Sequence, residues 1–142
     1  MPGMLHWLQK HNHFSFFNGN RYKLPFDPFK TFAAAGSIKT MVPDSDDPFR
    51  DLKEFYDSEH DWLIGRLNYD LKNSLEDLDS NNFDRLESEE MSFFIPESLI
   101  FIQSEGIMIS TVHDPDLVFN EIIHFPVSPH VQHSFQIECD TS

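Results

Sequence analysis

The sequence predicts an α+β fold in which a mostly antiparallel sheet is flanked by two or three helices. Apolar segments of strand length are joined by short turns, which is typical of hairpins rather than of alternating strand and helix. Asp-Pro precedes two segments with helical periodicity, and it is a common helix start, with Asp as N-cap and Pro at the first helical position. The 142 residues suffice for a domain that buries about 70% of its unfolded surface.

The first third of the chain contains three expected elements. Apolar residues in Met4–Lys10 indicate a short helix, and the aromatic run Phe14–Phe17 indicates a strand that ends at turn-forming residues 18–20. The segment Phe29–Ala35 fits two structures. It can be a helix that starts after Asp-Pro and ends at Gly36, or a buried strand, because a short apolar run does not decide between them.

The middle of the chain predicts a helix followed by a strand. Apolar residues on one helical face favour a helix over Pro48–Asp57, and Trp62–Tyr69 has the character of a strand. Gly65 within this strand indicates the close approach of another backbone or a ligand. Leucines at helical spacing predict a helical turn over 71–78, and the acidic segment Asp79–Glu90 predicts an exposed loop.

The last elements form a hairpin and a helix. Two apolar strands, Phe93–Ile95 and Leu99–Ile102, are separated by Pro96, which cannot donate to a sheet ladder and therefore breaks the strand. A turn then returns the chain as a strand over Ile107–Val112. A further Asp-Pro, at Asp114 and Pro115, starts a helix that we expect to end near His124.

Composition excludes several classes of function. The chain has 10 Lys and Arg against 24 Asp and Glu, a net charge of −14, which argues against binding to nucleic acid or to an anionic membrane. A single cysteine, Cys139, cannot form an internal disulfide or a thiolate zinc site. We find no basic and apolar N-terminal leader and no apolar run of membrane-spanning length, so we expect a cytoplasmic protein.

Two histidine pairs have a spacing that can bind metal. They are His11 with His13, and His130 with His133. Neither pair has a third or fourth ligand nearby, so we expect solvated loop histidines and no metal site.

Carboxylates give two further patterns. Residues 77–81 match the first ligand positions of a calcium loop, but Ser88 stands where a bidentate glutamate is needed, which favours an acidic solvated loop. Asp61 and Asp70 flank the predicted Gly65 strand. Two such carboxylates can do acid–base chemistry, but helix capping or a salt bridge accounts for each of them equally well.

The segment Asp61–Glu76 resembles a motif of a known family. It has the form D-W-x-x-G-x-L-x-Y-D-L-K-N-x-x-E and is similar to component I of para-aminobenzoate and anthranilate synthases, chorismate-utilising enzymes, with the para-aminobenzoate branch the closer. Three further parts resemble the same branch in the same order, namely Phe16–Asn20, Phe32–Gly36 and Phe93–Pro96.

The resemblance implies structural roles for the motif residues. The family's large sandwich of antiparallel sheets implies that Phe29–Ala35 is a strand and that Gly65 allows close sheet packing. Tyr69 and Asp70 would end the strand, and Asp70 or Glu76 would bond to local backbone.

The resemblance also implies a pocket for an aromatic amino acid, which in the family holds tryptophan. The matching residues are Phe16, Phe17, Asn18 and Gly19. Gly19 stands where the family often has serine, and Asn18 replaces an acid. We therefore regard this pocket as vestigial.

The function implied by the resemblance is that of a non-catalytic portion of aminodeoxychorismate synthase component I. The full enzyme converts chorismate to 4-amino-4-deoxychorismate for folate synthesis, uses Mg²⁺, and receives ammonia from a glutamine amidotransferase subunit. Residues 1–125 match the N-terminal domain, and 126–142 form a loop-like tail where the catalytic domain would begin. We thus expect the chain to be inactive alone, without a cofactor of its own, and to expose an apolar surface that favours self-association.

Three alternatives remain on the sequence alone. The chain can belong to the anthranilate branch, it can be a stand-alone amino-acid-binding regulatory module of the same fold, or it can be an unrelated acidic protein-interaction domain.

Overall fold

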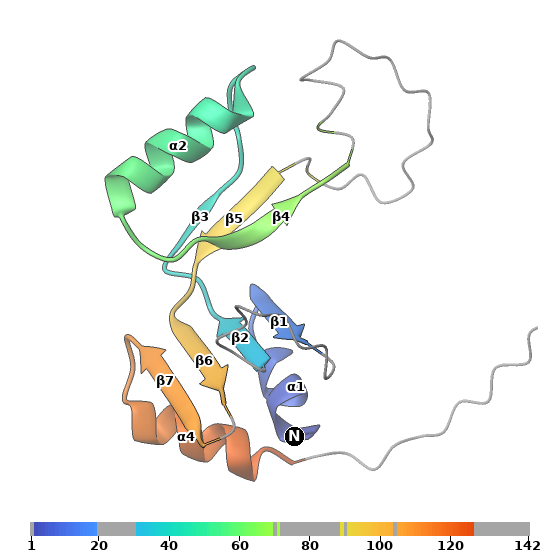
Figure 1. The fold of residues 1–142 in the computed structure, drawn as a ribbon, viewed down its shortest axis with the longest axis vertical. Coiled ribbons are helices and arrows are strands. Elements are labelled where there is room, and N and C mark those ends of the chain that lie inside the picture. Colours follow the sequence, from blue (N-terminus) through green and yellow to red (C-terminus); the bar gives the residue numbers. More distant parts are fainter. Residues whose placement is uncertain are drawn as a thin grey trace, which may run out of the picture.

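A computed structural model describes residues 2–19, 31–69, 71, 89, 91–103 and 105–126. Within these residues the chain forms two antiparallel sheets and three helices, which confirms the predicted α+β class (Figure 1). Over the same part of the chain, no helix combines the length and the apolar character that a membrane crossing requires.

The two sheets have four and three strands. The four-stranded sheet contains, in spatial order, β1 (Phe14–Asn18), β2 (Thr31–Ala35), β6 (Ser98–Ile102) and β7 (Ile107–Thr111). The three-stranded sheet contains, in spatial order, β3 (Lys39–Met41), β5 (Met91–Ile95) and β4 (Ile64–Leu67). Every pairing in both sheets is antiparallel.

Two long stretches of chain pass through both sheets. β2 continues into β3, β5 continues into β6, and the two stretches pair with each other on both sides of a kink. Gly36, at φ 73°, makes the kink on one stretch, and the predicted break at Pro96 makes it on the other. The Ile38 amide donates to the Ile95 carbonyl at 2.8 Å, so the pairing resumes directly after the kink.

Helices α1 (Pro2–Leu8) and α4 (Pro115–His124) cover one face of the four-stranded sheet (Figure 1). Asp114 caps α4 as predicted, because its carboxylate accepts from the backbone amides of the first turn. The helices and alternate strand residues enclose the main core, which consists of Met4, Trp7, Leu8, Ala33, Ala35, Ile100, Val118 and Ile122.

Helix α2 (Pro48–Glu59) lies beside the three-stranded sheet (Figure 1). Asp47 caps it by accepting from the Arg50 amide at 3.0 Å, and His60 ends it in the left-handed conformation at φ 52°. Leu52 and Phe55 pack toward a small buried cluster, which consists of Met41, Leu71 and Met91.

The structure resolves the ambiguous segment Phe29–Ala35 in favour of a strand over Thr31–Ala35. This strand pairs with β1 on one side and β6 on the other, and its three alanines are fully buried. The small side chains fit a central strand between two layers, so tertiary packing overrides the local helix-start signal.

The expected strand Trp62–Tyr69 is too long, because β4 covers only Ile64–Leu67. The Leu71 amide donates to the Asn68 carbonyl at 3.2 Å, which turns the chain after the strand. The rest of the predicted helical turn (72–78), almost all of the predicted loop (79–90) and the tail from 127 lie outside the described residues.

Candidate functional site

The four residues of the expected amino-acid pocket do not converge in the structure. Phe16 packs against the core under the helices, whereas Phe17 is on the other face of the sheet and stacks on Phe32, with ring centroids 5.7 Å apart. Asn18 and Gly19 are exposed at the end of β1. Consecutive strand residues point to opposite faces, which separates the two phenylalanines. That this pocket is vestigial stays a prediction.

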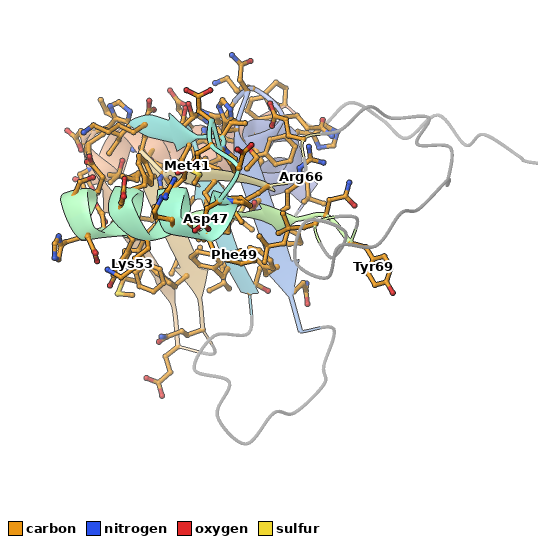
Figure 2. The ribbon with its side chains drawn as sticks, turned by 90° about the horizontal axis from the view of Figure 1, so that it is seen from above. Met41, Asp47, Phe49, Lys53, Arg66 and Tyr69 are labelled. Atoms are coloured by element: carbon orange, nitrogen blue, oxygen red, sulfur yellow. The ribbon has the colours of Figure 1, made fainter. Side chains whose placement is uncertain are left out.

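Gly65 lies on β4, directly opposite Phe93 of β5. A Cβ atom at Gly65 would clash with the Ser92 carbonyl oxygen and would come within 2.5 Å of Cδ1 of Phe93. The expected close approach of another strand is therefore present. Tyr69 is 76% exposed and projects away from the sheet (Figure 2). Asp70 and Glu76 lie outside the described residues.

A row of large apolar side chains crosses the face of the four-stranded sheet opposite to α1 and α4. Strand register places Phe17 beside Phe32, Phe32 beside Phe101, and Phe101 beside Met108. Trp62, from the segment between α2 and β4, lies over this row, with its ring centroid 6.2 Å from Phe32 and 5.9 Å from Phe101. We call these five residues the aromatic face.

The aromatic face is only partly covered. Phe17 is 52% exposed, and Trp62 and Met108 are each 51% exposed. Ile64 and Phe94 of the three-stranded sheet cover the adjacent part of this face of the four-stranded sheet. Among the described residues, the buried cluster on this side contains no residue from a helix. Sequence reasoning placed Trp62 in a strand and therefore missed its contact with the other sheet.

The opposite side of the molecule carries a polar cluster around Trp7. Its indole Nε1 donates to Oε2 of Glu121 at 2.9 Å, and Nζ of Lys10 lies 3.4 Å from the same oxygen. The hydrogen bond from Trp7, together with Lys10, lowers the pKa of Glu121. The cluster joins α1 to α4 across the main core.

The expectation of solvated histidines is wrong for His11. Its ring packs edge-on against Trp7 at 4.7 Å between centroids, and its Nε2 is buried with no hydrogen-bond partner in the part of the chain that the structure describes. Burial lowers the pKa of His11, although the carboxylates of Glu97 and Glu121 act in the opposite direction. The contact with Trp7 comes from the helix preceding the loop, which the spacing of the histidines does not reveal.

Two polar pairs surround the kink between the sheets. Nδ1 of His13 lies 3.1 Å from Oγ of Ser37, and Nε2 of His113 lies 3.1 Å from Oε2 of Glu97. Each pair ties the kink to a neighbouring segment, which suits a structural role. His130 and His133 lie outside the described residues.

A metal centre is not assembled in the part of the chain that the structure describes, since no group of three or more His, Cys, Asp or Glu side chains could hold an ion there. The calcium-like segment 77–81 and Asp70 lie outside this part. Asp61 instead accepts a hydrogen bond from the backbone amide of Trp62 at 2.7 Å.

No model of a known protein family matches the chain, and no curated protein matches it significantly. The structure defines an α+β domain of two antiparallel sheets with an open aromatic face. The membership in the component I family that the resemblance of Asp61–Glu76 implies stays a prediction.

Proposed function

We propose that the chain is a non-catalytic domain of a chorismate-utilising enzyme of the aminodeoxychorismate synthase component I type. The resemblance of Asp61–Glu76 to the para-aminobenzoate branch supports the choice of family. The observation that carries the role is the open aromatic face, because it fits a scaffold that packs against another layer of the same enzyme.

A sheet with apolar residues on both faces needs a layer on each side. Here α1 and α4 supply one layer, and the three-stranded sheet supplies part of the other. Phe17 and Met108 mark the two ends of the uncovered row, and both are about half exposed. In this proposal, the layer that covers Phe17 and Met108 is the catalytic part of component I.

In this proposal the chemistry belongs to the rest of a cytoplasmic enzyme. The catalytic part binds chorismate and Mg²⁺, and a glutamine amidotransferase subunit supplies the ammonia that replaces the C4 hydroxyl. The domain keeps the catalytic part folded and positioned.

The test combines the purified chain with a separately expressed catalytic half of an aminodeoxychorismate synthase component I. Sedimentation velocity should show a complex of the two, and the double variant Phe17→Ser with Met108→Ser should not form it. The chain alone, given chorismate, ammonium and Mg²⁺, should produce no 4-amino-4-deoxychorismate.

A matched control is Leu117→Ser, because Leu117 is 64% exposed but lies on α4, on the helix-covered side. This variant should bind the catalytic half as the unaltered chain does. Absence of a complex, equal binding by the double variant, or turnover of chorismate by the chain alone would contradict the proposal. Calorimetry that shows tryptophan binding would instead favour the regulatory module.

A further inference from the structure

A hollow of about 560 Å³ lies at the C-terminal end of α2. It is lined by Tyr56, His60, Asp61, Trp62 and Leu63. These residues belong to the last turn of the helix and to the segment that leads into β4. The hollow is shallow and largely open to solvent, and its volume is within the range of about 300–1,000 Å³ that small-molecule sites occupy.

The charges at this hollow favour a cation. The carbonyl groups at a helix C-terminus carry partial negative charge, and basic residues in the last turn usually compensate it. The last turn of α2, which is described over its whole length, has no basic residue of its own, and the nearby Lys39 ammonium pairs with Glu59 at 2.6 Å. Asp61 adds a carboxylate, whose Oδ1 accepts the Trp62 amide at 2.7 Å and keeps further lone pairs available.

The aromatic rings of the hollow favour the same kind of ligand. Tyr56 and Trp62 are each 51% exposed, and the Tyr56 ring also stacks on that of His60 with centroids 6.1 Å apart, so each ring presents part of its surface to solvent. The Trp62 ring is also held against Phe32 and Phe101 of the four-stranded sheet, which limits the rotamers it can adopt. Exposed ring faces attract cations, and the effect is greatest for tryptophan.

We propose that this hollow binds a quaternary ammonium group. A metal ion is a poor fit, because among the described residues Asp61 is the one carboxylate that lines the hollow and no three-ligand cluster exists. A weakly hydrated, methylated ammonium combines charge with apolar surface and suits a site made of rings and a carboxylate. The group can come from a small molecule such as choline or from a trimethylated lysine.

The experiment uses tryptophan fluorescence of the full chain at pH 8. The chain has two tryptophans, and Trp7 is 2% exposed, so a Trp7→Phe background makes Trp62 the sole reporter. Titration with choline or tetramethylammonium should change the Trp62 emission saturably, with a dissociation constant on the order of millimolar. The neutral isostere 3,3-dimethyl-1-butanol should give no saturable change.

Variants identify the contributing groups. Asp61→Asn and Tyr56→Ala should each weaken choline binding about three- to tenfold. Phe49→Ala, on the first turn of α2 and outside the hollow, should leave it unchanged. A peptide with trimethyllysine that binds more tightly than choline assigns the group to a protein, and the reverse order assigns it to a small molecule. Circular dichroism verifies that each variant is folded.

The proposal is overturned if no ammonium probe binds saturably, if the neutral isostere binds equally well, or if both variants bind choline normally. It shares Trp62 with the aromatic face but does not require the proposed function, and the two proposals can be tested separately. The double variant Phe17→Ser with Met108→Ser removes the ends of the aromatic face but no residue of the hollow, so it should retain choline binding.

Discussion

The two faces of the four-stranded sheet are built from the same strands but are completed differently. On one face, Ala33, Ala35 and Ile100 are almost fully buried beneath α1 and α4. The next residue on each strand points to the other face. There the row of large apolar side chains ends at Phe17 and Met108, and both are about half exposed. A shift of one residue changes the face, so neighbouring positions in the sequence should differ sharply in what a substitution does.

The largest expected effect is on the helix-covered face. Trp7 is 2% exposed and its indole donates to Glu121, so Trp7→Ala removes a large buried ring and one of the two donors to this carboxylate. We expect the free energy of unfolding to fall by about 3–5 kcal/mol. Urea denaturation followed by circular dichroism measures this change, with Trp62→Ala as the control on the open face. An equal loss of unfolding free energy in the two variants would contradict this prediction, because it would show that the two faces of the sheet are covered to the same extent.

A smaller effect concerns the pH dependence of the same face. Because burial lowers the pKa of His11 below its ordinary value of 6.5, the unfolded state binds more protons than the folded state as the pH falls through that range. This contribution to stability is complete above pH 6.5 and is lost as the pH falls toward the lowered pKa. The urea midpoint should therefore decrease between pH 7.5 and 5.5.

His11→Gln is the variant that isolates this effect, since glutamine does not titrate. Its urea midpoint should vary less with pH over the same range. The groups that act on His11 are Glu97, Glu121, Lys10 and His113, and all of them are retained in the variant. An unchanged pH dependence would assign the acid sensitivity to other groups.

The smallest effect on stability is expected at the ends of the open row. Phe17→Ser with Met108→Ser should lower the free energy of unfolding by about 1–2 kcal/mol, less than Trp7→Ala does, because both side chains are already half in water. The same variant should reduce concentration-dependent self-association in sedimentation experiments, because it makes the aromatic face less apolar. Self-association that is the same in the variant would place the contact elsewhere.

Local chemistry predicts the elements better than it predicts the surfaces. The Asp-Pro starts at Asp47 and Asp114 are N-caps as expected, and Pro96 breaks a strand as expected. The segment Phe29–Ala35 could not be assigned from its own residues, because its two strand neighbours decide its structure. The burial of His11 was missed for the same reason.

The candidate sites depend even more on tertiary structure. Phe17, Phe32, Phe101 and Met108 are spread over four strands, and only the register of the sheet places them in one row. Trp62 was assigned to a strand although it precedes β4 and lies over the other sheet. Sequence did indicate the close approach at Gly65, because a glycine within a strand often lies where a neighbouring backbone leaves no room for a side chain.

The two kinked stretches of chain also have a consequence for the rate of folding. The β6–β7 hairpin can form from adjacent residues, but both sheets require the region from 31 to 41 to find the region from 91 to 102. Closing so long a loop is entropically costly, and contacts between distant parts of a sequence slow folding. One late pairing event should thus complete both sheets together, and neither sheet should be populated as an intermediate without the other.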